Sequence, residues 1–330
     1  NLNKRSVCLD LAVAAAREKL QALIDWADIV VHSLRRAEAM QLGLDRDSIS
    51  ADRPELVVLS MTPFGMTGPY SEFAAEELIV AHAGGWPSMC PMTHQEPEYP
   101  PLKVHGHHCS LMAGIAGAMS ALAVHLDARR SGVGELIDFS VQEYVASVLE
   151  FGIHIYTYHD FVISRLNQRS TIPWRIFNAK DGPIFVVCIE EDQWERLVEF
   201  MGQPEWTQME TFVEPSGRAE NQDMVNVFLE EFISEWNVFD LYHAAQKFRI
   251  CFAPVMSFAQ IGASEHLRAR NFFTTVDIPS IGPIEFMAPP VIASEGRATI
   301  RLAAPQLGEH TDEVLEDIQP AGKVNATVEA

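Results

Sequence analysis

The sequence predicts an α/β protein in which helices and buried strands alternate, followed by a second, smaller unit. Two apolar runs in the first half fit short buried strands, IVV at 29–31 and ELVVLSM at 55–61, and each is preceded by a helical or polar segment. The second half opens on a hairpin pattern, WRIFNAKDGPIFVVCIEE at 174–191. Polar residues and turn formers at 163–173 indicate a linker between the two halves.

Composition, net charge and cysteine pattern limit the partners and the cellular compartment that we expect for this protein. The chain has 330 residues, 48% of them hydrophobic and 21% charged, which is typical of a globular protein. Its formal net charge of −21 repels nucleic acid and anionic lipid, so we expect neither nucleic acid nor a membrane as a partner. Five scattered cysteines without CxxC spacing predict a reducing compartment, and therefore a cytoplasmic protein.

The first half is expected to place a loop at the carboxyl end of its second strand. Apolar residues at helical spacing predict a helix over 11–26, ahead of the strand at 29–31. The strand at 55–61 runs into TPFGMTGPY at 62–70, whose glycines and prolines mark a loop, and a helix is predicted over 76–83. Open parallel sheets bind ligands at such loops.

A long helix is predicted to begin near residue 111. Its large apolar residues share one face, while glycine and alanine occupy the others; the members of this face are Leu111, Ile115, Met119, Leu122 and Leu126. Such a helix packs closely against a neighbour or holds a ligand close. A strand at 135–141 and a helix at 142–159 are expected to follow.

The second half adds helices and irregular strands. Helices are predicted at 192–201, 221–236, 239–247 and 311–318, with irregular strands at APVMSF, ARNFF and IGPIEFMAPP. We expect Thr311 to be the N-cap of the last helix. Beyond Gln319 the tail is predicted to be frayed.

The stretch KVHGHHCS at 103–110 gathers residues that often carry chemistry. His105, His107, His108 and Cys109 are metal-ligand types, but their spacing does not place them on one face and no second cluster accompanies them, so we expect no metal. Ser110 lacks the GxSxG elbow of a hydrolase, although His107 or His108 could act as a base. The simpler expectation is that Ser110 is the N-cap of the long helix.

Several segments taken together resemble the class III CoA-transferase family, and the resemblance is spread over the whole chain. The segments that carry it are NKRSVCLDL at 3–11, ADIVVHSLRRAEAMQLGLD at 27–45, FGMTGPY at 64–70, ARRSGVGELIDFSV at 128–141, FNAKDGPIFV at 177–186, FAPVMSF at 252–258, ARNFF at 269–273 and APQLGEHTDEVL at 304–315. Each motif alone is weak, whereas their order and spacing together are specific.

The resemblance implies a fold and a set of boundaries. A large Rossmann-like domain would span 1–162, a linker 163–173 and a small α/β domain 174–262, and residues 263–330 would return to the large domain or to a partner in an interlocked dimer. The family's opening strand, helix and glycine-containing turn would precede NLNKRS. We therefore expect either that the sequence is a fragment or that a separate polypeptide supplies that edge.

The resemblance also implies the chemistry expected at Ser110. In family transferases an aspartate at this position attacks the acyl-CoA thioester, giving a mixed anhydride and then an aspartyl-CoA thioester. An acyl-serine ester is lower in energy than the thioester, so serine cannot carry this mechanism unaided. The family's racemase branch has a histidine where this sequence has Glu76, and is disfavoured; Glu77 retains the acidic residue near the active site.

Coenzyme A or acyl-CoA is the expected substrate, and no metal is expected. The resemblance places Leu2 and Lys4 in the segment that lines CoA, and Lys4 matches a CoA-contacting lysine that suits anionic phosphates. Ser33 and Leu34 stand where the family has an Asn-Phe pair, and Gln41 replaces a basic residue.

The leading hypothesis is a CoA-transferase subunit that lacks the nucleophile and takes an acyl-CoA and a carboxylic acid. It would act in a homodimer or in a heterodimer with a paralogous subunit that carries the aspartate. The first alternative is an active CoA-ester lyase, isomerase or thioesterase that uses Glu77, His107 or His108 as acid or base. The second is a non-catalytic binding protein. Arg165, Arg169 and Arg175 could hold a dicarboxylate, but we expect them to be solvated at the surface.

Overall fold

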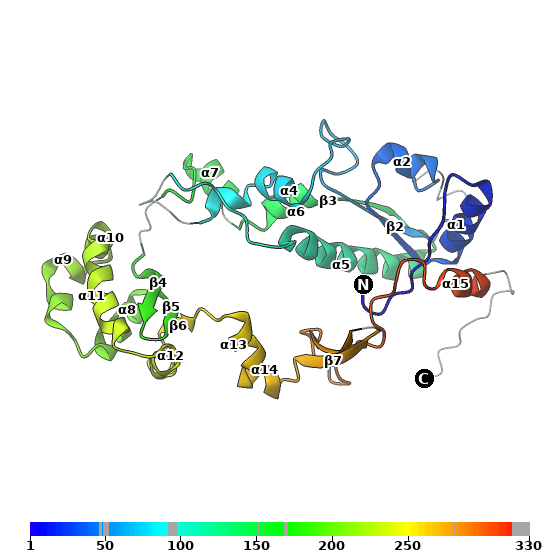
Figure 1. The fold of residues 1–330 in the computed structure, drawn as a ribbon. Coiled ribbons are helices and arrows are strands. Elements are labelled where there is room, and N and C mark those ends of the chain that lie inside the picture. The colour runs from blue at the N-terminus through cyan, green and yellow to red at the C-terminus, as the bar shows by residue number, and fades with distance from the viewer. Residues whose placement is uncertain are drawn as a thin grey trace. The chain divides into compact units, whose positions relative to one another are not determined.

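The structure is a computed structural model that describes residues 1–45, 48, 53–91, 98–150, 152–167, 171–279 and 281–318. The chain divides into two compact units, Asn1–Asn167 with Arg301–Ala330, and Gln168–Ile300 (Figure 1). The domain boundaries expected from the sequence stay a prediction. The tail beyond Gln319 and the side chain of Arg169 lie outside the described residues.

A parallel sheet organises the first unit. Its strands, in spatial order, are β1 (Ile29–His32), β2 (Val57–Thr62) and β3 (Leu136–Ser140), and both neighbouring pairs run parallel. The central strand β2 is buried at Val57, Val58 and Leu59, which explains why it reads as an unbroken apolar run rather than an alternating one. The predicted α/β class is confirmed.

Helices cover both faces of β2. Leu56 and Val58 pack in one cluster with Ile24 of α1 (Ala14–Trp26) and Ala39 of α2 (Arg36–Gln41). On β2, Leu59 and Met61 point to the opposite face, because successive side chains of a strand alternate. There they meet α5 (His108–Ser131), where a Cβ on Gly117 would lie only 2.9 Å from the Met61 sulfur, so the glycine permits close packing of helix on strand.

The crossover from β2 to β3 fixes the direction of α5. It passes through α4 (Glu77–Ala83) and the 3₁₀ turn η1 (Trp86–Met89) before reaching α5. Because β2 and β3 are parallel, the crossover returns from the carboxyl edge of the sheet to its amino edge along α5. The N-terminus of α5 therefore lies toward the carboxyl edge of the sheet, and Figure 1 shows the course of this helix along the strands.

One predicted helix is divided in the structure. Instead of a continuous helix over 142–159, α6 (Val141–Ser147) and α7 (Gly152–His159) are separated by a turn. Glu150 in this turn has a left-handed backbone, with φ of 52°. A residue in this conformation cannot continue a right-handed helix, and the apolar periodicity of the sequence did not reveal it.

The second unit contains an antiparallel sheet with helices packed on it. The predicted hairpin is confirmed as β4 (Trp174–Ala179) and β5 (Gly182–Val187), and β6 (Cys251–Pro254) pairs with β5. Helices and turns between the strands are α8 (Glu191–Phe200), η2 (Glu205–Gln208), α9 (Glu210–Val213), α10 (Pro215–Glu220), α11 (Gln222–Ser234) and α12 (Val238–Lys247). Phe177, Leu197 and Leu229 are among the fully buried residues of their shared core.

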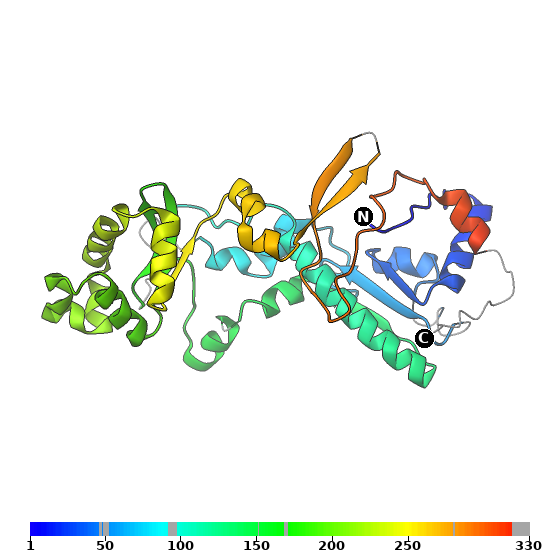
Figure 2. The ribbon, with the colours of Figure 1, turned by 90° about the horizontal axis from the view of Figure 1, so that it is seen from below.

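The second unit ends in two short helices and a hairpin. These are α13 (Phe258–Ala263), α14 (Glu265–Ala269) and the antiparallel strands β7 (Phe273–Ile278) and β8 (Gly282–Met287), the orange pair in Figure 2. The last helix, α15 (Thr311–Asp317), belongs to the first unit. Its N-cap is His310, so the prediction of Thr311 at that position is wrong.

The N-terminal segment is bound to helix α15 within the first unit. The Arg5 guanidinium contacts the carboxylates of Glu313, at 3.1 Å, and Asp317, at 2.6 Å, on α15. The Thr311 hydroxyl accepts a hydrogen bond from the Cys8 N–H at 3.1 Å. The extended N-terminal segment is thus held in place by the C-terminal helix rather than by secondary structure of its own.

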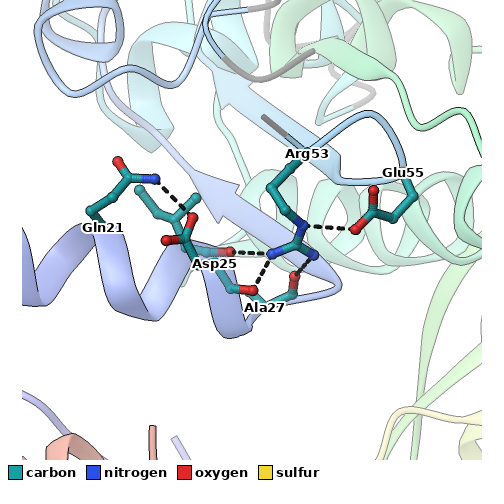
Figure 3. A network of polar contacts seen from close by, with 6 residues as sticks. Gln21, Asp25, Ala27, Arg53 and Glu55 are labelled. Atoms are coloured by element: carbon teal, nitrogen blue, oxygen red, sulfur yellow. Dashed lines mark hydrogen bonds and ion pairs between the residues drawn. The ribbon is translucent and has the colours of Figure 1, made fainter. Parts of the chain in front are cut away.

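Arg53 closes the C-terminal end of α1. Its guanidinium donates to the backbone oxygens of Ile24, Asp25 and Ala27, at 3.4 Å for Ile24 and 3.1 Å for Ala27, and its Nε contacts Glu55 at 2.7 Å (Figure 3). The last carbonyls of a helix have no partner within the helix, and cationic side chains suit this end of the helix dipole. One side chain thus fixes α1 to the start of β2.

We expect Arg53→Ala to lower the free energy of unfolding by about 1–3 kcal/mol, because it removes one charged donor from the backbone oxygens of Ile24, Asp25 and Ala27, of which the Ile24 and Ala27 contacts are partly buried. Urea unfolding monitored by circular dichroism would measure this. Arg36→Ala, which removes an exposed arginine from α2, is the matched control and should change the free energy by less than about 0.5 kcal/mol. Equal effects from the two substitutions would contradict this role of Arg53.

Candidate functional site

The candidate site centres on a carboxylate bound at the N-terminus of α5. Glu77 Oε1 accepts a hydrogen bond from the Cys109 N–H at 2.7 Å, and Oε2 accepts one from the Ser110 N–H at 3.1 Å. The Ser110 hydroxyl donates to the same Oε2 at 2.7 Å. Glu77 is only 9% exposed, so these contacts replace most of the water around its carboxylate.

Packing of α4 against α5 brings Glu77 to this position. Glu77 is the first residue of α4, and the next turn of that helix places Val80 and Ala81 in a buried cluster with Cys109 and Val145. The first N–H groups of a helix lack partners within the helix and carry partial positive charge, so they bind a carboxylate well. Glu77 therefore caps a helix to which it does not belong.

Ser110 does not have the capping role predicted for it. The N-cap of α5 is His107, which makes no side-chain cap hydrogen bond, and Ser110 is the third residue of the helix. The Ser110 hydroxyl faces Glu77 instead of a backbone N–H. The prediction was wrong because the helix begins earlier than its apolar pattern, at His108.

The hydrogen bonds at Glu77 keep it ionised. Burial alone would raise the pKa of Glu77, but the hydrogen bonds from the Ser110 hydroxyl and from the Cys109 and Ser110 N–H groups outweigh it, so the pKa lies below its usual value. A carboxylate with a lowered pKa is a weak base. It therefore does little to remove the Ser110 proton.

The neighbours of Ser110 do not form a nucleophile-and-base pair with it. Within the described part of the chain, no hydrogen bond joins the rings of His107 or His108 to Ser110. Cys109 is buried, and burial followed by the nearby Glu77 charge raises the pKa of its thiol to about 11, which keeps it protonated at neutral pH. The described residues contain no group of three or more His, Cys, Asp or Glu side chains placed to hold a metal ion.

The FGMTGPY loop follows β2 and is anchored by a residue that the sequence did not single out. Asp138 of β3 accepts a hydrogen bond from the Met66 N–H at 2.9 Å. Gly65 has φ of 84°, which a glycine adopts without strain, and it lies against the same carboxylate. Asp138 is part of a strand with ordinary alternation, so nothing in its local sequence indicated this contact.

The residues expected to contact CoA all lie in the first unit, in two places. Ser33 and Leu34 directly follow β1, and Gln41 is the last residue of α2, so these three belong to one loop-and-helix connection at the carboxyl end of β1. Leu2 and Lys4 lie in the N-terminal segment, and the Lys4 ammonium contacts Asn1 Oδ1 at 3.1 Å. Ser33, Gln41 and Lys4 are exposed, whereas Leu34 packs against the core.

Of the three arginines that could hold a dicarboxylate, the structure describes Arg165 and Arg175, and these two differ in burial. Arg165 is 7% exposed, so its expected solvation at the surface is wrong. The backbone N–H of Arg165 donates a hydrogen bond to the backbone oxygen of Ser88 at 2.7 Å, which attaches the segment around Arg165 to η1. Arg175 is exposed on β4, with its guanidinium 5.2 Å from the centre of the Phe177 ring.

The long helix α5 has a buried face and an exposed apolar face. Ala113, Gly117 and Ala121 are buried. The predicted apolar face is exposed instead, and we call it the α5 stripe: Leu111 (66%), Ile115 (66%), Met119 (67%), Leu122 (56%) and Leu126 (62%). By length and composition alone α5 could cross a membrane, but its small residues pack on a sheet.

These features define an α/β protein with a parallel sheet and a cluster of polar side chains at the N-terminus of the crossover helix α5. The sequence model of CoA-transferase family III matches residues 1–311, and the chain belongs to that family. The expected family is thereby confirmed.

Curated relatives agree with this family. The chain is 26% identical over 321 residues to the succinate–glutarate CoA-transferase of Agrobacterium fabrum, covering 97% of this chain and 79% of that protein. It is 26% identical to the succinyl-CoA–L-malate CoA-transferase beta subunit of Chloroflexus aurantiacus, covering 96% and 78%. It is also 26% identical to a subunit of the succinyl-CoA:(R)-benzylsuccinate CoA-transferase of Thauera aromatica, again covering 96% and 78%.

Solved structures share the fold. A CaiB/BaiF family protein from Brucella suis superposes with a TM-score of 0.83 at 23% identity, over 97% of this chain and 82% of that one. Rv3272 from Mycobacterium tuberculosis gives a TM-score of 0.81 at 21% identity, over 94% and 83%.

We expect Glu77→Gln to lower the free energy of unfolding by about 1–3 kcal/mol at pH 7, because an amide cannot replace an ionised acceptor for two N–H groups and a hydroxyl. Since folding lowers the pKa of Glu77, its contribution is present above the carboxyl's unfolded pKa, about 4.3, and is lost as the pH falls through the lower folded value. The wild type and the variant should therefore converge in stability on acidification.

Urea unfolding at several pH values measures this difference. Glu76→Gln makes the same change at the adjacent exposed residue and should behave like the wild type. A difference between wild type and Glu77→Gln that does not shrink as the pH falls below the unfolded pKa of about 4.3 would mean that the Glu77 charge does not stabilise the helix end.

Proposed function

We propose that the chain is the non-nucleophilic subunit of a heteromeric CoA-transferase, which moves CoA from an acyl-CoA to a carboxylic acid together with an aspartate-bearing paralogous subunit. The observation that carries this proposal is the bond between Ser110 and Glu77. Ser110 stands at the position where the family resemblance implies an aspartate, and its hydroxyl donates to a carboxylate at 2.7 Å.

Energetics explain why the nucleophile must come from elsewhere. When an aspartate attacks the thioester carbonyl, CoA leaves as thiolate and a mixed anhydride forms; the thiolate then attacks the aspartyl carbonyl and the donor acid leaves. The resulting aspartyl thioester is as energy-rich as the starting one, so the acceptor carboxylate can receive CoA by the reverse steps. An acyl-serine ester lies lower, and returning its acyl group to CoA would be uphill.

Glu77 is poorly placed to act as the missing nucleophile. Both of its oxygens accept hydrogen bonds, and its pKa is lowered by them. A nucleophilic carboxylate has to present an oxygen lone pair to the substrate, whereas these lone pairs are directed at the helix. We assign Glu77 the role of holding the N-terminus of α5 beside the reacting groups.

The α5 stripe supports an assembly of two subunits. It joins several large apolar side chains, each more than half exposed, into one face of a helix whose opposite face is buried in the sheet packing. An exposed apolar face of this kind marks an interaction surface in a folded protein. Relatives include proteins named as alpha and beta subunits of one CoA-transferase, which favours a heterodimer over a homodimer.

We further propose that CoA is bound by the first unit. Ser33, Leu34 and Gln41 follow β1 at the edge where open parallel sheets bind ligands. Leu2 and Lys4 would approach the nucleotide end of CoA, where the lysine charge offsets the phosphates in a protein of net charge −21. A cytoplasmic location agrees with such metabolism and remains a prediction.

One alternative is favoured by the same hydrogen bond. A serine hydroxyl 2.7 Å from a carboxylate could be acylated by a CoA ester and then hydrolysed, which would make the isolated chain a thioesterase. The lowered pKa of Glu77 argues against it, because the carboxylate accepts a proton weakly. The two functions differ in whether the isolated chain turns over and whether Ser110 is needed.

Activity measurements with succinyl-CoA and a panel of carboxylic acids test the proposal. The isolated chain should show no transfer, and adding the aspartate-bearing subunit should raise the rate by more than about 100-fold, the order of effect expected of a catalytic nucleophile. Ser110→Ala should leave the rate of the complex within about fivefold, since it removes one hydrogen bond. Turnover by the isolated chain that Ser110→Ala abolishes would establish the alternative and overturn the proposal.

The α5 stripe is tested by one charge placed on it. We expect Ile115→Glu to weaken association with the aspartate-bearing subunit by at least about tenfold while the chain stays folded, because the residue is 66% exposed. Ala123→Glu adds the same charge at an exposed position of α5 outside the stripe and serves as control. Analytical ultracentrifugation measures both, and undiminished assembly of the Ile115→Glu variant would exclude the stripe as the contact.

A further inference from the structure

A pocket of about 480 Å³ lies in the second unit, and none of its lining residues belongs to the candidate site in the first unit. Its walls come from the residues just after α14, from β7 and from the segment 288–300. This volume falls in the range of sites for small molecules. Among the residues that the structure describes, its lining includes two arginines, Arg270 and Arg297, and no acidic residue.

Arg297 connects two walls of the pocket by a hydrogen bond. Arg297 Nη2 donates to the Arg270 backbone oxygen at 3.0 Å, which holds the 288–300 segment against the end of α14. Arg297 Nη1 is buried and has no hydrogen-bond partner among the residues that the structure describes. A guanidinium stays charged at all ordinary pH values, so an unpaired buried donor on it is unfavourable.

A neighbouring arginine, Arg268, has a carboxylate partner of the kind that the described pocket lining does not contain. Arg268, on α14, forms a bidentate pair with Glu285 of β8 and lies 4.4 Å from the centre of the Phe273 ring. The Glu285 carboxylate of the hairpin is therefore already engaged by Arg268. Arg270 and Arg297 face the pocket without a carboxylate in its lining, in a protein whose net charge is −21.

We propose that this pocket binds a small oxyanion, a carboxylate or a phosphate, between Arg270 and Arg297. Guanidinium groups bind such oxyanions with charge-assisted hydrogen bonds, and both arginines line the pocket. The apolar part of the ligand would lie against Phe273 and Ile292, and the Thr274 side chain adds a hydroxyl to the lining. The site is independent of the proposed subunit function.

Isothermal titration calorimetry of the full chain at low ionic strength tests the site, with inorganic phosphate and with succinate as probes. We expect saturable binding of at least one probe with a dissociation constant of about 1 mM or tighter. Arg270→Gln should weaken it at least about tenfold, since it removes a charged donor. Arg270 is exposed, so this variant should fold normally.

Two further variants complete the experiment. Arg297→Gln should weaken binding to a similar degree, and circular dichroism of this variant reports whether the pocket wall survives the loss of its bond to Arg270. Arg196→Gln removes the same charge from a half-buried arginine that pairs with Asp192 on α8, outside the pocket, and should leave binding within about twofold.

Each outcome decides the proposal. Binding of phosphate alone identifies a phosphate-bearing ligand, and binding of succinate alone a carboxylate, and both support the site if Arg270→Gln weakens them. Absence of heat for both probes up to about 50 mM, a concentration that would reveal even weak binding, overturns it. Binding that Arg270→Gln leaves unchanged also overturns it. None of these outcomes affects the test of transfer activity.

Discussion

The carboxylate of Glu77 at the N-terminus of α5 is the contact on which the candidate site depends. A 24-residue helix begins there with unpaired N–H groups, and its own N-cap residue, His107, makes no side-chain cap hydrogen bond. Glu77 supplies the acceptor from α4, and the cluster of Val80, Ala81, Cys109 and Val145 keeps the two helices together. Electrostatics and apolar packing thus fix the same geometry.

This structural use of Glu77 limits the chemistry available to the chain. A carboxylate whose lone pairs are occupied by helix donors is held ionised and is neither a good base nor an accessible nucleophile. Ser110 is bound by it rather than activated, and Cys109 is protonated because burial raises its pKa to about 11. The described residues at this helix end therefore form a hydrogen-bonded polar cluster in which Glu77 is an acceptor and Ser110 a donor.

Helix α5 has small residues on the face that packs on β2 and large apolar residues on the exposed face. Its small residues let it approach β2 so closely that a Cβ added at Gly117 would lie 2.9 Å from the Met61 sulfur. Its large apolar residues then point away from the sheet, and the predicted apolar face is the exposed one. The spacing of the large apolar residues identified one face of α5. It did not show that the sheet covers the opposite face, because that contact depends on the small residues of α5, whose short side chains let the helix approach β2.

The sequence by itself determined the α/β class, the parallel strands at Ile29 and Val57, the hairpin around Asp181 and membership of the family, since these follow from periodicity, turn chemistry and motif order. Only the tertiary structure decided what Glu77, Asp138 and Arg53 do. Each of these side chains bonds to backbone groups far away along the chain or on another element, the Cys109 N–H for Glu77 and the Met66 N–H for Asp138. Such contacts leave no local periodicity, because they depend on which elements the fold brings together.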